Sequence, residues 1–163
     1  MRSEHGQCAK VGGFSLKEKL FAQGTFNLAV IIGAYGMWVL SPILALGYLV
    51  YALGSFTLLM RYTICARCPH LLQAGDCLFL PASLARKIIA TDRSGPLGLG
   101  EKIILYAAFV GTFLTPVILL SSPLLFWGYI LFAGGCLVGL VLHFCKHCHN
   151  AVCPLNRRCE KVN

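Results

Sequence analysis

Two long stretches without a charged side chain constrain this sequence more than any other feature. Residues 20–60 and residues 103–144 contain no Lys, Arg, Asp or Glu. A helix needs about 20 apolar residues to cross a bilayer, so each stretch is long enough for two crossings. Only 12% of the residues are charged, whereas soluble domains carry about 25%. The chain is therefore predicted to be an integral membrane protein.

A Ser-Pro pair interrupts each stretch near its middle, at Ser41-Pro42 and Ser122-Pro123. Because proline pushes the preceding residue out of the helical region, each stretch is predicted to fold as a helical hairpin. The expected fold is thus an all-α membrane protein whose four transmembrane helices form two tandem hairpins. The expected spans are residues 22–40, 43–62, 103–120 and 124–144.

The basic residues predict the orientation of these spans. All fourteen lie in residues 1–19, 61–102 and 145–163. Since basic loops stay in the cytoplasm, both termini and the central loop are expected on the cytoplasmic side. The membrane is expected to be a prokaryotic cytoplasmic membrane. The net charge of +8 is then explained by topology and by contact with membrane lipids. No basic patch interleaved with aromatic side chains is evident, so nucleic acid is not an expected partner.

The two halves of the chain resemble each other, which predicts a parallel internal repeat. Three dipeptides and one cysteine motif recur in the same order and at a nearly constant separation along the chain. They are Glu18-Lys19 and Glu101-Lys102, Ser41-Pro42 and Ser122-Pro123, Gly47-Tyr48 and Gly128-Tyr129, and the motifs that begin at Cys65 and Cys145. Halves that both run out of the cytoplasm and back are related by a pseudo-twofold axis along the membrane normal.

The repeat divides the chain into residues 1–80, an amphipathic connector at 81–102, and residues 103–163. Leu80, Leu84 and Ile88 recur at every fourth position beside basic residues, which predicts a short helix on the cytoplasmic membrane surface. Residues 14–20, with apolar side chains among lysines, predict a similar interfacial segment before the first span.

Cysteines supply the candidate chemistry. Seven of the nine follow predicted helix ends on the cytoplasmic side, where reducing conditions disfavour disulfides. Two C-x2-C pairs stand at equivalent positions of the repeat, and each pair can present two thiolates to one zinc ion or iron–sulfur cluster. The candidate metal ligands are Cys65, Cys68, His70, Cys77, Cys145, Cys148, Cys153 and Cys159.

Two partitions of these ligands remain open. In the first, the two C-x2-C pairs share one site on the pseudo-axis. In the second, which the spacing favours, each half closes its own site. The first-half set is Cys65, Cys68, Cys77 and His70, and the second-half set is Cys145, Cys148, Cys153 and Cys159.

Other cysteine and histidine patterns have simpler explanations. Cys8 and Cys136 are expected to behave as small apolar residues. Residues 145–149 match the C-x-x-C-H attachment motif for c-type haem, but that attachment occurs outside the membrane, opposite to the predicted orientation. His143, at the end of the fourth span, is expected to be an interfacial residue rather than a haem ligand.

These observations favour a protein without catalytic activity of its own, because neither a nucleophile–base pair nor a paired-carboxylate site is evident. The leading hypothesis is a cytoplasmic cysteine layer that holds structural zinc and presents a surface to a protein partner. The alternative is an iron–sulfur electron-transfer subunit of a membrane oxidoreductase, which Cys153-Pro154 favours because Cys-Pro ends bacterial ferredoxin motifs. Soft-metal transport or resistance is a third hypothesis, although Cys136 is alone among the span residues.

Overall fold

The computed structural model describes residues 13–68, 78 and 97–144. Every regular element in these ranges is helical, and four segments are long and apolar enough to cross a membrane. The predicted all-α class with four candidate spans is therefore confirmed. The segments are α1 (Leu16–Leu40), α2 (Pro42–Gly54) continued by the π-helical turn η1 (Ser55–Leu59), α6 (Leu99–Leu119), and α7 (Pro123–Gly139) continued by the π-helical turn η3 (Leu140–Phe144). After η1 follow α3 (Met60–Thr63) and the 3-10 turn η2 (Cys65–Arg67).

Both Ser-Pro pairs separate helices, as predicted. Ser41 has the extended backbone angles φ −163° and ψ 130°, and Ser122 is also extended at φ −80° and ψ 123°. Pro42 and Pro123 each begin the next helix, where the missing N–H of proline costs no helical hydrogen bond.

The first helix starts earlier than its predicted span. Ser15 and Glu18 form a capping box, in which the Glu18 N–H donates to Ser15 Oγ at 3.3 Å and the Ser15 N–H donates to Glu18 Oε2 at 2.7 Å. The cap lets the helix begin at Leu16 and run without a break to Leu40, so residues 16–20 form no separate interfacial helix. Most of the predicted connector, residues 81–96, lies outside the described residues, and its last part belongs to α6.

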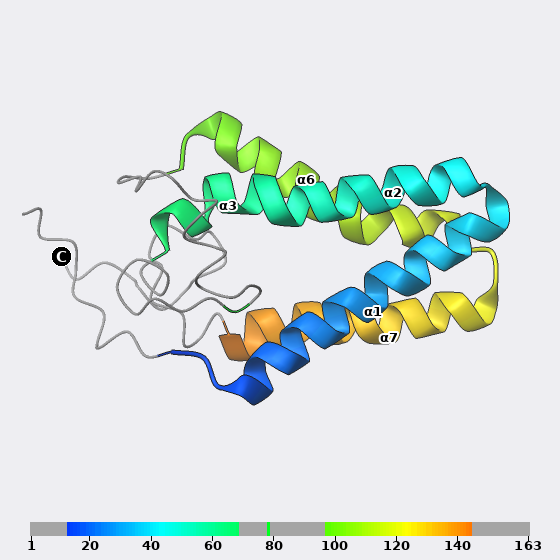
Figure 1. Ribbon diagram of the computed structural model, residues 1–163, viewed down its shortest axis with the longest axis horizontal. Helices are drawn as coiled ribbons and strands as arrows, with labels where there is room; N and C mark the ends of the chain where they lie inside the picture. The colour runs from blue at the N-terminus through cyan, green and yellow to red at the C-terminus, as the bar shows by residue number, and fades with distance from the viewer. Residues whose placement is uncertain (1–12, 69–77, 79–96, 145–163) are drawn as a thin grey trace, which may run out of the picture.

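The helices pack as two pairs, each with one member from either half of the chain. Helix α1 lies against α7, and the segment from α2 to α3 lies against α6 (Figure 1). The pairs meet where α1 contacts α2 and α6 and where α6 contacts α7. This contact runs from the Ser-Pro turns to Phe26, whose ring packs against Phe56 and Phe113. The pairs diverge toward the opposite end, where α1 and α6 begin and where α3 and η3 end (Figure 1). We call this the cysteine end, because Cys65 and Cys68 lie there.

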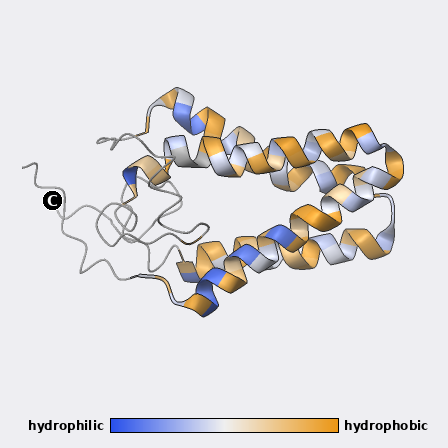
Figure 2. Ribbon diagram, in the orientation of Figure 1, coloured by the Kyte–Doolittle hydropathy of each residue, from blue (hydrophilic) through white to orange (hydrophobic). Residues whose placement is uncertain are grey.

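Hydrophobic residues predominate along the four helices (Figure 2), and many of the large ones are exposed. Ile43 and Leu124 are 81% and 82% exposed, and they are two of many large hydrophobic residues on this surface. Trp38 and Trp127 are also exposed, within a few residues of the Ser-Pro turns. Hydrophilic residues gather instead near the cysteine end (Figure 2). This distribution is consistent with an integral membrane protein, with tryptophans at one membrane–water interface.

All four helices meet at one polar point within the apolar bundle. Pro116 lies inside α6 and has no N–H, so the Thr112 carbonyl one turn earlier loses its helical donor. The Tyr48 hydroxyl of α2 donates to this carbonyl at 3.1 Å. The Tyr129 hydroxyl of α7 lies 3.0 Å from the Phe113 carbonyl and 3.4 Å from that of Thr112.

Helix α1 reaches the same point through a glycine. A Cβ atom on Gly33 would lie 3.0 Å from Pro116 Cγ and 3.2 Å from the Tyr48 hydroxyl, so a side chain here would push both groups back by a few tenths of an ångström, and glycine allows the close approach. We call Gly33, Tyr48, Thr112, Pro116 and Tyr129 the four-helix junction. The two tyrosines occupy equivalent positions of the predicted repeat, since each follows the glycine of a Gly-Tyr pair.

Candidate metal centre

The first C-x2-C motif forms a tight turn at the cysteine end. Cys65–Arg67 is one turn of 3-10 helix, closed by hydrogen bonds from the Arg67 N–H to the Ile64 carbonyl and from the Cys68 N–H to the Cys65 carbonyl, each 3.1 Å. A 3-10 helix has three residues per turn, so side chains at positions i and i+3 stand on the same side. Cys65 and Cys68 have this spacing, with Cys68 as the extended residue that caps the turn, and both are half-buried. The turn therefore fits a pair of ligands to one metal ion.

The remaining predicted ligands are His70, Cys77, Cys145, Cys148, Cys153 and Cys159, and they lie outside the described residues. Within residues 13–68, 78 and 97–144, no group of three His, Cys, Asp or Glu side chains comes together. The described part of the chain thus contains two of the proposed ligands. It also contains Phe144, the residue before Cys145, at the end of η3.

Arg67 ties the cysteine turn to α6. Its Nη2 atom lies 3.2 Å and 3.0 Å from the two carboxylate oxygens of Glu101, and its Nη1 donates to the Thr63 carbonyl at 2.9 Å. The Arg67 and Glu101 side chains are only 8% and 17% exposed. Removing one partner of such a sheltered ion pair takes away a charge that compensates the other, so the contact is costly to break.

Glu18 makes the corresponding contact between α1 and the end of η3. Its Oε1 atom lies 3.2 Å from His143 Nε2, in an exposed position before the charge-free stretch begins. The other oxygen, Oε2, accepts the Ser15 N–H of the capping box, so the carboxylate is held at the start of α1 while it faces His143. His143 therefore lies at the helix end with an exposed side chain.

The two contacts follow one pattern. Glu18 and Glu101 occupy equivalent positions of the predicted repeat, and each carboxylate accepts the N–H of the residue that precedes its helix, at 2.7 Å from Ser15 and 3.0 Å from Gly98. Each glutamate also contacts a basic residue from the other half of the chain, at the end of that half's second helix. Both second helices pass through a π-helical turn before this end.

The sequence did not identify the roles of Arg67, Glu101 and the junction tyrosines. One signal was available for the junction, because a proline inside an apolar stretch of helical length frees the carbonyl four residues earlier. The contact between Arg67 and Glu101 spans 34 positions, and no local pattern predicts such a pairing. Cys136 lies buried with Phe26 and Val30 in the core, where it packs as a small apolar residue, as expected.

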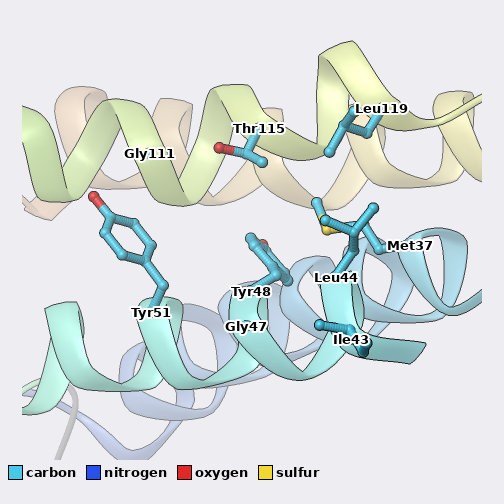
Figure 3. A pocket seen from close by; sticks show the side chains of 9 residues that line it. All are labelled: Met37, Ile43, Leu44, Gly47, Tyr48, Tyr51, Gly111, Thr115 and Leu119. Carbon is cyan, nitrogen blue, oxygen red and sulfur yellow. The ribbon is translucent and has the colours of Figure 1, made fainter. Parts of the chain in front are cut away.

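A cleft of about 300 Å³ lies between α2 and α6 (Figure 3). It is lined by Met37, Ile43, Leu44, Gly47, Tyr48, Tyr51, Gly111, Thr115 and Leu119. The Tyr51 hydroxyl points to α6 and donates to the Ala107 carbonyl at 2.7 Å (Figure 3). Tyr48 and Tyr51 thus direct their protons to helix carbonyls, and none of the described residues that line the cleft is a Cys, His, Asp or Glu. The cleft is separate from the described cysteine turn.

Comparison of the chain with protein-family models, with curated proteins and with solved structures finds no match.

Proposed function

We propose that this chain is a metal-binding integral membrane protein without catalytic activity of its own. Its cytoplasmic cysteine layer holds structural zinc at the helix ends and presents a surface to a protein partner. The observation that carries the proposal is the 3-10 turn Cys65–Arg67, which the Cys68 N–H closes, so that both cysteines of one C-x2-C motif lie in a single tight turn at the end of a helical segment. Zinc bound there supplies no redox chemistry; it cross-links the chain segments that provide its ligands.

We propose one site in each half, because the Cys65 turn and the end of η3 belong to different pairs of helices, although Leu78, the residue after Cys77, packs with Ala22 and Phe144. The turn at Cys65 follows α3, which packs on α6, whereas η3, which precedes Cys145, continues α7, and α7 packs on α1. Among the described residues, α7 and η3 have no extensive contact with α2, η1, α3 or η2. The two pairs of helices also diverge toward this end (Figure 1). A single site shared by both C-x2-C pairs would have to span this separation.

The proposed duplication is supported by the paired contacts across the halves. The pseudo-twofold relation would exchange α1 with α6 and α2 with α7. It accounts for the equivalent roles of Glu18 and Glu101 and for the approach of Tyr48 and Tyr129 to adjacent carbonyls. The basic residues near the helix ends support a cytoplasmic location for both termini and for the cysteine end.

An iron–sulfur centre is the second candidate, because Cys153-Pro154 resembles the end of a ferredoxin cluster motif. In that case the chain would carry electrons as a subunit of a larger membrane oxidoreductase. The same cysteines would be the ligands, so ligand identity does not separate the candidates. Redox behaviour does.

The test is an absorption spectrum of protein purified without oxygen, before and after dithionite. Zinc bound by thiolates has no accessible redox change, so we expect a colourless protein that dithionite leaves unaltered. A visible absorption band that bleaches on reduction would instead establish the iron–sulfur candidate. The Cys153→Ser variant is the matched sample: it should lose metal without any optical change.

A further inference from the structure

We infer that Arg67 and Glu101 are a positioning pair, through which the second half of the chain holds the first cysteine turn in the geometry that binds metal. The inference rests on the proposed zinc site. Arg67 is the residue before Cys68 within the motif, so its side chain is fixed to the same turn that carries both thiols. Glu101 is in the first turn of α6, on the other half of the chain.

The geometry of the pair shows how it acts on the turn. One nitrogen of Arg67 contacts both oxygens of Glu101, and the other donates to the Thr63 carbonyl in the preceding helical turn. Thr63 itself is fully buried, and its hydroxyl donates to the Leu59 carbonyl at 2.9 Å. The arginine thus links α6 to the last helical residues before Cys65. Rotation of the cysteine turn relative to α6 would break these contacts.

Glu101 is itself held in place by α6. Its Oε2 atom accepts the Gly98 N–H at 3.0 Å, at the start of that helix. The carboxylate therefore has a fixed position before it meets Arg67. Groups that orient metal ligands without touching the metal typically change metal affinity by about 10- to 100-fold when they are replaced.

The test measures the zinc affinity of the full-length protein by competition with a chelator. The Cys145→Ser/Cys148→Ser variant serves as the parent, so that the first-half site alone is observed. Glu101→Gln is the variant of choice, because glutamine still accepts the Gly98 N–H but no longer carries the charge that faces Arg67. We expect its zinc affinity to fall by about 10- to 100-fold.

Glu18→Gln is the matched control. It removes a capping carboxylate at the equivalent position of the other half, where the partner is the exposed His143, and it does not touch the turn at Cys65. We expect it to leave zinc affinity of the first-half site unchanged. Arg67→Gln should cost less affinity in the Glu101→Gln background than alone, because the contact with Glu101 is already weakened. The cost that remains reports the contact of Arg67 with the Thr63 carbonyl.

The outcomes are distinguishable. Unchanged zinc affinity in Glu101→Gln would overturn the positioning role, as would a variant that melts at a lower temperature without zinc yet binds zinc as its parent does. Equal losses in Glu18→Gln and Glu101→Gln would also overturn it. If the wild-type chain binds no zinc, the proposed function fails before any variant is compared.

Discussion

Replacing Cys65 and Cys68 with serine should remove about half of the bound zinc and lower the thermal stability of the protein. Structural zinc contributes about 10–16 kcal/mol of apparent binding free energy in small zinc domains, and this energy is coupled to folding. With separate sites, the ligands of the second half keep their ion. The measurement is the zinc content per chain, together with the melting temperature in one detergent.

The Cys145→Ser/Cys148→Ser variant should show a similar loss, because its cysteines hold the equivalent position. Cys136→Ala is the control, since Cys136 is buried in the core at the level of the spans. It should retain all the zinc. If either double variant lost all of its zinc, the ligands would form one shared site. Full zinc content in both double variants would remove these four cysteines from the ligand set.

Replacing Tyr48 with phenylalanine should lower the free energy of unfolding by about 1–2 kcal/mol. The change removes the hydroxyl that donates to the Thr112 carbonyl at 3.1 Å, and this carbonyl has no helical donor because Pro116 lacks an N–H. In a bilayer no water replaces the lost partner, and the Tyr129 hydroxyl, at 3.4 Å, is the remaining donor near this carbonyl. The effect should appear in equilibrium unfolding of the protein in detergent micelles.

Two further variants make this prediction specific. Tyr51→Phe removes a hydroxyl from the same helix, but its acceptor, the Ala107 carbonyl, lies one helical turn before Gly111, which has an N–H. We expect a smaller loss there. Pro116→Ala restores a donor for the Thr112 carbonyl, so Tyr48→Phe should cost less in that background. If Tyr48→Phe lowered the free energy of unfolding equally with and without Pro116, the hydroxyl would not stabilise the protein by satisfying the Thr112 carbonyl.

The architecture was predictable because its causes are local. The length of the charge-free stretches and the Ser-Pro pairs at residues 41 and 122 determine where spans begin and end. The start of α1 was placed too late because a span was defined by hydropathy alone. A polar capping box allowed the helix to extend beyond the apolar residues.

The candidate site was predictable only in part. Spacing alone identified Cys65 and Cys68, and the structure adds that they close a 3-10 turn. The carboxylate that fixes this turn belongs to Glu101 of α6. It is too distant along the chain from Arg67 for a local sequence pattern to predict the contact. The Gly-Tyr pairs were recognised as markers of a repeat. Both tyrosines donate hydrogen bonds to carbonyls near Pro116 because of how the four helices pack. Sequence pattern and composition do not determine this packing.

The most direct test of the proposed structural zinc sites is the metal content of the wild-type chain, purified without oxygen, together with a titration of its thiols. The account predicts about two zinc ions per chain and no visible absorption, because each half closes its own four-ligand site. The cysteines of both motifs should react with a thiol reagent only after a chelator has removed the zinc. A protein without metal, whose seven cysteines beyond the helix ends all titrate as free thiols, would contradict it.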